Sequence, residues 1–324
     1  MRISEHLGTN HSNLRVRADA VSILPDLIWH FDEPFADSSA VPTYYVSREA
    51  RRLVKVALSG DGGDENLAGY RRYRWHTYEE RMRSLLPAGL RQPLFGLLGR
   101  VYPKADWAPK IFRAKSTFEA MARDSLEGYL HSVSILSNRM RSDLFSDALK
   151  ADLQGYQAVE VFRRHAAAAP TDHPLSLVQY LDMKTYLVGD ILTKVDRASM
   201  AHALEVRVPI LDHKLVDWMS GLSPDLKLRG REGKYLFKKA LEPMLPNEIL
   251  YRQKMGFAVP LASWFRGPLR DKVRKNILSQ QMLDSGLFKR SYLEKMLDQH
   301  QSGVRDYSAP IWTLMMFGSF LNMR

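Results

Sequence analysis

Three carboxylates lie within a short run of glycines, and this run carries the strongest chemical signal in the sequence. It reads Ser59-Gly-Asp-Gly-Gly-Asp-Glu65 and contains Asp61, Asp64 and Glu65. A glycine turn before a helix presents free backbone N–H groups, which bind anions. Three carboxylates would repel a bare phosphate, so a phosphate fits only when a cation bridges it to them. The run indicates a metal–polyphosphate site, most simply for Mg-ATP or Mg-pyrophosphate.

The run differs from the two common nucleotide motifs. No Gly-Lys-Ser/Thr follows the glycines, as it does in a P-loop, and the glycine spacing is not that of a dinucleotide fingerprint. An acidic loop that only caps a helix fits the composition equally well, because Asp and Glu are favoured in the first helical turn. The run alone leaves both interpretations open.

Two charged segments in the second half of the chain have a structural interpretation that we favour. Asp190, Lys194 and Arg197 share one face of a predicted helix, and such a face more often carries a surface ladder of ion pairs than a site. Glu205 and Asp212 bound an extended apolar segment that also contains Arg207, and charges embedded in such a segment must pair. Neither segment indicates chemistry by itself.

Lys254 lies in a predicted loop, two residues before Gly256. A lysine in such a loop could reach a phosphate as a mobile cation. An ordinary solvated lysine is the simpler interpretation of this residue alone.

The elements around the glycine run are a strand before it and a helix after it. Residues 54–58 are mostly β-branched or apolar, which predicts a buried strand, and residues 65–73 return to helical spacing. A second short strand is predicted at 13–16. Two parallel strands joined by helices do not make a stable open sheet. We therefore expect further strands, unrecognised here or lying on sequence outside this chain.

Most of the remaining chain is predicted to be helical. The expected helices include 18–31, 41–53, 175–189, 191–204 and 282–300, whereas the proline-rich stretch 84–115 is expected to connect short helices.

The composition bounds the class of protein. The chain has 324 residues, is 45% hydrophobic, lacks cysteine and carries a formal net charge of +11. The lack of cysteine excludes disulfides, thiolate metal sites and a cysteine nucleophile within these residues. No nucleic-acid motif accompanies the basic residues, so a solvated basic face without a nucleic-acid partner is expected. No long apolar run or signal peptide is present, and we expect no membrane span and a cytoplasmic location.

Taken together, the segments resemble the synthetase (C-terminal) domain of glutamine-hydrolysing asparagine synthetases. The resemblance covers about residues 1–265 and rests on four motifs in order. They are Asp32-Glu-Pro with Asp37-Ser-Ser-Ala-Val-Pro42; Ser59 to Glu65 with Gly69-Tyr70; Lys194-Val-Asp-Arg197 with Leu204 to Asp212; and Gly233-Lys234 with Arg252-Gln-Lys-Met-Gly-Phe257.

The resemblance implies an α/β fold. The expected fold is an adenine-nucleotide alpha-hydrolase-like (PP-loop ATPase) parallel sheet, incomplete at its N-terminal side and followed by a mostly helical region. Residues 1–265 would form the synthetase domain, lacking its first strand and pyrophosphate loop, and residues 266–324 a helical C-terminal extension of the same domain.

The resemblance also implies a reaction in which ATP adenylylates a carboxylate, of aspartate or a related acceptor, and glutamine-derived ammonia displaces AMP. The implied cofactors are ATP and Mg²⁺. The implied catalytic residues are Lys254, Asp61 and Asp190; the nucleotide- and pyrophosphate-binding residues Ser59, Gly60, Gly62, Gly63 and Lys234; the acceptor-side residues Asp37, Ser38, Lys194 and Arg197; and the metal ligand Asp64. Within these roles, Asp64 would hold Mg²⁺ against pyrophosphate, and Lys254 would stabilise the charge on the departing pyrophosphate.

Two features of the family do not occur in this sequence. The family begins with a glutaminase domain whose nucleophile is an N-terminal cysteine, and it carries a pyrophosphate loop of Ser-Gly-Gly-x-Asp-Ser type. We therefore expect a partial chain, from a split gene, a pseudogene or a wrongly chosen start. Its glutaminase domain would be supplied elsewhere or missing, and the chain alone would turn over little or no ATP.

Three alternatives stay open. A degenerate, non-catalytic subunit that binds an amidotransferase partner is consistent with the missing loop. A β-lactam synthetase-like ligase would close an internal amide without ammonia, and Asp61 speaks mildly against it because a tyrosine there would favour that reaction. A nucleic-acid binder rests on charge alone and would be removed by failure to bind DNA or RNA at low ionic strength.

Overall fold

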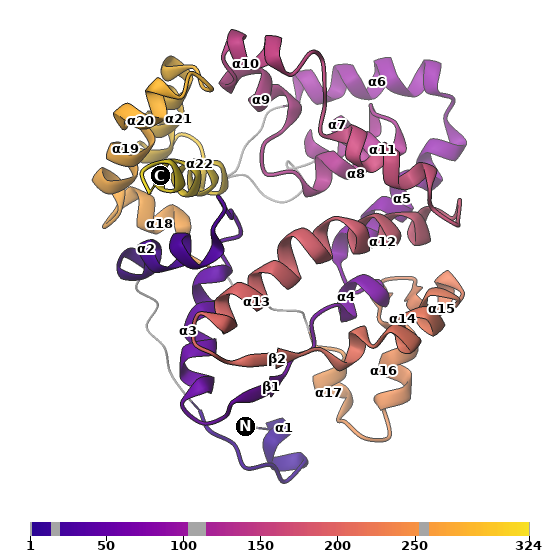
Figure 1. The fold of residues 1–324 in the computed structure, drawn as a ribbon. Coiled ribbons are helices and arrows are strands. Elements are labelled where there is room, and N and C mark those ends of the chain that lie inside the picture. Colours follow the sequence, from indigo (N-terminus) through magenta and orange to yellow (C-terminus); the bar gives the residue numbers. More distant parts are fainter. Residues whose placement is uncertain (1, 14–19, 103–114, 253–258, 324) are drawn as a thin grey trace. The chain divides into compact units, whose positions relative to one another are not determined.

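The computed structural model describes residues 2–13, 20–102, 115–252 and 259–323 (Figure 1). The chain divides into two compact units, each built from separated stretches of sequence. Unit 1 comprises residues 1–23, 39–77 and 169–258, and unit 2 comprises residues 24–38, 78–168 and 259–324. The glycine turn lies in unit 1.

Unit 1 holds the strands and the short helices around the turn. Its elements are α1 (Arg2–His6), α3 (Ala40–Arg51), β1 (Val56–Leu58), α4 (Gly63–Asn66), α12 (Pro174–Lys184), the π-helix η2 (Leu187–Leu192), α13 (Thr193–Met200), β2 (Glu205–Arg207), the 3₁₀-helix η3 (Pro209–Leu211), α14 (His213–Ser220), α15 (Pro224–Lys227), β3 (Leu228–Arg229), β4 (Glu232–Gly233), α16 (Tyr235–Leu241) and α17 (Asn247–Leu250).

Unit 2 is helical. Its elements are α6 (Ala88–Val101), α7 (Lys115–Met121), α8 (Ser125–Val133), α9 (Asn138–Leu144), α10 (Asp147–Asp152), α11 (Val159–Ala167), α18 (Leu261–Arg266), α19 (Arg270–Ile277), α20 (Gln280–Asp284), α21 (Arg290–Gln301) and α22 (Ser308–Leu321). Two helices cross the division of the chain, α2 (Ala20–Phe31) and α5 (Arg71–Leu85).

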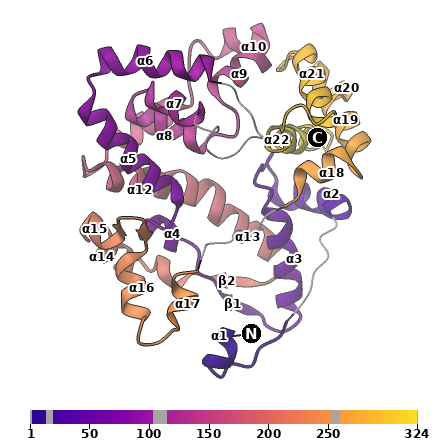
Figure 2. The same cartoon turned by 180° about the vertical axis from the view of Figure 1, so that it is seen from behind.

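A two-stranded parallel sheet carries the glycine turn. Strand β1 pairs with β2 so that Ala57 lies opposite Val206, and the ladder continues where Ser59 N–H donates to the Arg207 carbonyl at 2.8 Å. Figure 2 shows the two strands side by side. The predicted strand at 54–58 is confirmed in type. Its observed partner is the segment predicted only as extended, because a helical crossover brings that segment alongside. Of the other predicted strand, 13–16, residues 14–16 lie outside the described residues.

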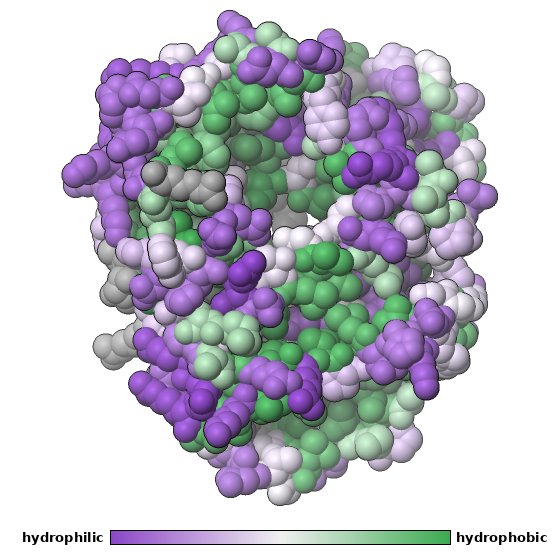
Figure 3. Space-filling view, viewed as in Figure 1, coloured by the Kyte–Doolittle hydropathy of each residue, from purple (hydrophilic) through white to green (hydrophobic). Residues whose placement is uncertain are grey.

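One face of β1 is apolar and reaches the surface. Val56 is 41% exposed and Leu58 is 73% exposed. The prediction of a buried strand is therefore wrong for these two side chains within the described residues. Figure 3 shows apolar side chains at the surface over this part of unit 1. Parallel strands normally have both faces covered, so this exposure is unusual for the type of sheet.

The chain turns sharply on both sides of α4. Gly62 has φ +80°, and the Leu211 side chain occupies the space that a Cβ there would need. Ala68 has φ +54°, which ends α4 before α5 begins at Arg71. The prediction of one continuous helix over 65–73 is therefore wrong, because a left-handed residue interrupts it.

The core of unit 2 includes the C-terminal helix. Ile311, Trp312 and Met315 of α22 are each at most 2% exposed, and α22 packs against α18, α19 and α20. The hydrophobic α22 is apolar around most of its circumference, as expected of a helix enclosed by others. Residues 266–323 contain α19, α20, α21 and α22.

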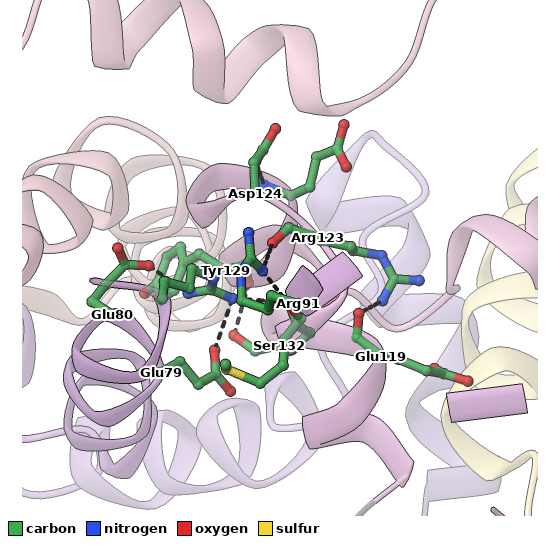
Figure 4. A network of polar contacts seen from close by, with 12 residues as sticks. Glu79, Glu80, Arg91, Glu119, Arg123, Asp124, Tyr129 and Ser132 are labelled. Carbon is green, nitrogen blue, oxygen red and sulfur yellow. Dashed lines mark hydrogen bonds and ion pairs between the residues drawn. The ribbon is translucent and has the colours of Figure 1, made fainter. Parts of the chain in front are cut away.

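Two arginines close the end of α7 in unit 2. Arg83 Nη2 donates to the Ala120 carbonyl at 2.8 Å. Arg91 Nη1 donates to the carbonyls of Met121 and of Arg123, the latter at 2.7 Å. Figure 4 shows Arg91 at the centre of this polar network. The last carbonyls of a helix have no partner within it, and here the guanidinium groups donate to them, in addition to the Arg123 N–H that donates to Ala120.

Helix α6 differs from the prediction for 84–115. It runs unbroken from Ala88 to Val101 with Pro93 inside, where short helices and connections were expected. Residues 103–114 of that stretch lie outside the described part of the chain.

In the residues that the structure describes, we find no helix both long enough and apolar enough to cross a membrane.

Candidate functional site

The first acid of the turn is held by the residue that ends the strand. Ser59 Oγ donates to Asp61 Oδ2 at 2.5 Å. The backbone of Ser59 is itself fixed to β2, so this hydrogen bond orients Asp61 relative to the sheet. Gly60 between them has open space around the position of a Cβ, which leaves room for a ligand beside the turn.

The second acid meets a lysine from a distant part of the sequence. Lys234 Nζ lies 3.0 Å from Asp64 Oδ1, and the two side chains are 28% and 21% exposed. Lys234 precedes α16 in a left-handed conformation with φ +57°, and its N–H donates to the Leu67 carbonyl at 2.8 Å. Left-handed backbone is costly for lysine, and such strain is found at functional sites.

Glycines allow this close approach. A Cβ on Gly69 would overlap Asp64 Oδ1 and crowd Lys234 Cε, and a Cβ on Gly233 would overlap the Ala68 carbonyl. Both positions therefore require glycine for the acid and the amine to meet. At Gly63 the nearest atoms are Ile210 Cδ1 at 3.1 Å and Lys234 Nζ at 3.6 Å.

The third acid of the run turns away from the other two. Glu65 is 1% exposed and accepts a hydrogen bond from Tyr70 Oη at 2.8 Å. Burial raises the pKa of Glu65, and burial together with the Glu65 charge raises the pKa of Tyr70. The sequence grouped three carboxylates at one anion site, but Glu65 packs into the interior of unit 1. The site acids of the turn are therefore Asp61 and Asp64.

The segment with Asp190 contains a π-helical turn. Asp190 lies within η2, which directly precedes α13. Lys194 is 8% exposed and donates from Nζ to Ser39 Oγ at 2.8 Å, whereas Arg197 is exposed. A surface ladder of ion pairs is the wrong description of Lys194, because its amine is enclosed between α13 and α3. The buried lysine places the start of α3 beside this helix.

The charges of the extended segment pair, as predicted. Arg207 Nε lies 2.7 Å from Glu205 Oε1, and both side chains are largely exposed. Asp212 caps α14 by accepting hydrogen bonds from the N–H groups of Lys214 and Leu215. Their role in this structure is local.

For three predicted residues the structure gives no placement relative to the turn. Asp37 and Ser38 directly precede α3 in sequence and belong to unit 2. Lys254 lies outside the described residues.

The sequence reasoning missed a set of buried polar residues behind the turn. Gln179 Nε2 donates to the carbonyls of Glu65 and Asn66 at 2.6 and 3.0 Å. Asp182, one turn further along α12, accepts from Arg72 and Tyr73. Gln179 and Asp182 are 3% and 1% exposed. The available signal was a pair of polar residues with i, i+3 spacing on the buried face of an otherwise apolar helix.

The donor set fits a shared cation rather than a metal cage. Among the described residues, no group of three or more His, Cys, Asp or Glu side chains is arranged to hold a metal ion. Asp64 offers one partly exposed carboxylate at a glycine turn. Mg²⁺ is commonly held by one or two carboxylates with the remaining positions filled by substrate phosphates and water. Asp64 thus fits an ion that arrives with a phosphate.

Comparison with known proteins identifies the type of domain. The family model described as asparagine synthase matches residues 1–322. Asparagine synthetase [glutamine-hydrolyzing] 1 of Bacillus subtilis (strain 168) is 33% identical over 91% of this chain and 44% of its own length. A putative asparagine synthetase [glutamine-hydrolyzing] of Mycobacterium tuberculosis (strain ATCC 25618 / H37Rv) is 34% identical over 97% of this chain and 46% of its own length. The chain spans less than half the length of these curated relatives.

Proposed function

The chain belongs to the asparagine synthase family, and on that premise we propose that it takes part in ATP-dependent amide formation in the cytoplasm. A carboxylate oxygen of aspartate, or of a related acceptor, attacks the α-phosphorus of ATP and pyrophosphate leaves. Ammonia derived from glutamine then attacks the acyl carbon, and AMP leaves as the amide forms. Members of this family are carbon–nitrogen ligases of the asparagine synthase type. We further propose that the chain has the PP-loop ATPase fold.

The observation that carries the proposal is the meeting of Asp64 with Lys234 at the Gly62 turn. A partly exposed amine and carboxylate 3.0 Å apart at a glycine turn offer a cation for phosphate oxygens and a ligand for a metal ion. Lys254, on the segment that follows α17, is the second cation proposed for the pyrophosphate side. Ser59, Gly60, Gly62 and Gly63 would lie against the nucleotide.

The other proposed roles fall to residues near the acceptor. Asp61 would face the ammonia and the acyl-adenylate, together with Asp190, and could take the proton that ammonia loses on attack. Asp37, Ser38, Lys194 and Arg197 would bind or frame the acceptor carboxylate. The Lys194–Ser39 hydrogen bond supports this, since it holds the residue after Ser38 against α13.

Mg²⁺, when bound, would screen the charge of the polyphosphate. Asp64 is the residue of this chain that we propose as its ligand. Lys234 and Lys254 would supply positive charge to the pyrophosphate, which would favour charge build-up on the leaving group in the transition state.

We also propose that polypeptide outside these 324 residues completes the site. The sequence contains no Ser-Gly-Gly-x-Asp-Ser loop, and its relatives are more than twice as long as the region they share with it. Among the described residues β1 pairs with β2 alone, so its other edge could take a further strand, and the exposed Val56 and Leu58 leave one face for another layer to cover. A glutaminase domain that supplies ammonia belongs to the same proposal.

The test is an assay of AMP and pyrophosphate formation from ATP by the purified 324-residue protein, with aspartate and ammonium as co-substrates. We expect little or no product, because on this proposal part of the pyrophosphate site lies outside these residues. AMP formation at rates of about 1 s⁻¹, within the usual enzyme range, would contradict the partial-site proposal. If it depended on aspartate and ammonium, it would support the ligase assignment directly.

A further inference from the structure

A buried ion pair lies behind the glycine turn, and Arg72 is its centre. Arg72 Nη2 and Nε donate to Asp182 Oδ2 at 2.6 and 3.1 Å. Tyr73 Oη donates to the same oxygen at 2.6 Å. Asp182 is 1% exposed. Three donors on one oxygen of a buried carboxylate fix its orientation, and the charge requires this pairing to stay inside.

The same guanidinium lies between two tyrosine rings. Arg72 Cζ is 3.9 Å from the Tyr70 ring centroid and 4.5 Å from the Tyr186 ring centroid. The two rings are themselves 6.0 Å apart in an edge-on arrangement. A planar, delocalised cation can stack on aromatic faces and still donate in its own plane, which an ammonium cannot do. Arginine is therefore specifically suited to this position.

Each tyrosine leads to one of the proposed site acids. Tyr70 Oη donates to Glu65, the residue after Asp64 on α4. Tyr186 directly precedes the π-helix that contains Asp190. Short π-helical segments are rare and are frequently found at functional sites.

A second contact joins the same elements. The Gln179 amide on α12 donates to the last carbonyls of α4 at Glu65 and Asn66. Helix α4 is thereby tied to α12 at one end and carries Asp64 at the other.

We propose that Arg72 is a positioning residue that couples the glycine turn, with its acids Asp61 and Asp64, to the π-helical turn of Asp190. Its ion pair anchors it to α12, and its contacts with the Tyr70 and Tyr186 rings link the position of one segment to that of the other. The functional meaning of the coupling rests on the proposed function, whereas the coupling itself is a property of unit 1.

The experiment is native-state hydrogen exchange on the full 324-residue protein without nucleotide. Arg72→Lys keeps the positive charge but loses the planar guanidinium group, and with it the contacts with the two tyrosine rings and the two hydrogen bonds to Asp182. We expect exchange to rise about tenfold in both 59–66 and 186–192, beyond the change in global unfolding measured on the slowest amides. The matched control is Arg71→Lys, which alters a neighbouring arginine that lies over Trp75 at 5.7 Å on the surface. It should leave both segments unchanged.

A double-mutant cycle distinguishes a coupling between the two segments from a destabilisation of the whole protein. Asp182→Asn should produce the same two-segment increase, and the double variant should add little, because both changes break one unit. The proposal is overturned if only one segment responds, if all amides accelerate by the same factor, or if the two substitutions add fully. Because no ligand is present, these outcomes do not depend on whether the protein binds nucleotide. Failure of pyrophosphate binding would count against the proposed function alone.

Discussion

At the scale of single residues, Lys234 combines an unfavourable backbone with a useful side chain. Its φ of +57° is a conformation that glycine adopts without strain, yet the position holds a lysine whose amine reaches Asp64. Local strain of this kind persists when a side chain is needed there. The amine, rather than the backbone, is the feature to test.

We expect Lys234→Gly to keep the stability of the protein within about 1 kcal/mol, since relief of strain offsets the lost ion pair and the added freedom of the unfolded chain. Lys234→Ala should be less stable than Lys234→Gly by about 1 kcal/mol, because alanine keeps the strain. Urea denaturation of the two variants measures this difference. Equal stability of the alanine and glycine variants would show that the left-handed backbone carries no strain.

The buried Glu65 should make the stability of the protein depend on pH. Burial raises its pKa, so the folded protein holds a proton that the unfolded chain releases at lower pH. This contribution to stability is fully present below the unfolded pKa of about 4.3 and is lost as pH rises through the folded value. A one-unit difference in pKa corresponds to about 1.4 kcal/mol.

Glu65→Gln removes this ionisation and keeps an oxygen that can accept from Tyr70. We expect the natural protein to lose more stability than the variant as the pH rises. The Tm of the variant minus the Tm of the natural protein should therefore increase by a few degrees from pH 4 to pH 8. Thermal melts over that range measure it. The exposed Glu5→Gln is the control and should show no such trend. A constant difference between Glu65→Gln and the natural protein would refute the buried-carboxyl account.

At the scale of elements, the end of α7 depends on two arginines rather than on a cap from its own sequence. Arg91 is 5% exposed, and burial lowers its pKa. It donates to the backbone carbonyl of Met121 in a buried hydrogen bond and to that of Arg123 in a partly buried one.

Arg91→Leu should destabilise the protein by about 3 kcal/mol, because carbonyls that accepted from a charged group lose their donor. Arg100 is exposed on α6, the helix that also carries Arg91. Arg100→Leu should therefore change the free energy of unfolding by no more than about 0.5 kcal/mol. Chemical denaturation monitored by circular dichroism measures both. Equal midpoints for the two variants would mean that the carbonyls of Met121 and Arg123 are satisfied by water.

Several elements could be predicted from the sequence, and the errors have physical causes. The strand at 54–58 and the turn after it follow from β-branched residues and glycine. The pairing with 205–207 could not be predicted, because parallel strands meet through tertiary crossovers rather than through local sequence. The break after α4 was missed because an alanine, not a glycine, takes the left-handed conformation at Ala68. The π-helix around Asp190 has no signature in a helical period.

In the candidate site, too, some features could be predicted from the sequence and others could not. Asp61 and Asp64 could be identified from composition, since carboxylates among glycines are chemically specific. Their separation from Glu65 depends on which side of a short helix faces the interior. The pairing of Asp64 with Lys234 depends on tertiary contact and was not predicted; Lys234 was a candidate only through the family resemblance. The ion pair of Arg72 with Asp182 was not recognised at all, because each residue alone reads as an ordinary surface charge.

At the scale of the whole molecule, the chain forms two compact units of different composition. Unit 1 contains the parallel sheet, the glycine turn and the lysine that meets it, and unit 2 is helical, with α22 packed against α18, α19 and α20. The family match extends over both units, and the relatives continue well beyond the shared region. We infer that this chain supplies the acid turn and the acceptor-side helices of a ligase whose remaining phosphate-binding residues lie elsewhere.

The most direct measurement is ³¹P NMR of pyrophosphate titrated with the 324-residue protein, with and without Mg²⁺, because line broadening detects weak binding. The natural protein should broaden the pyrophosphate resonance only when Mg²⁺ is present. Asp64→Asn and Lys234→Gly should each abolish the effect, whereas Arg100→Leu should retain it. Broadening that is independent of Mg²⁺, or that survives Asp64→Asn, would contradict the assignment of the glycine turn as a metal–pyrophosphate site.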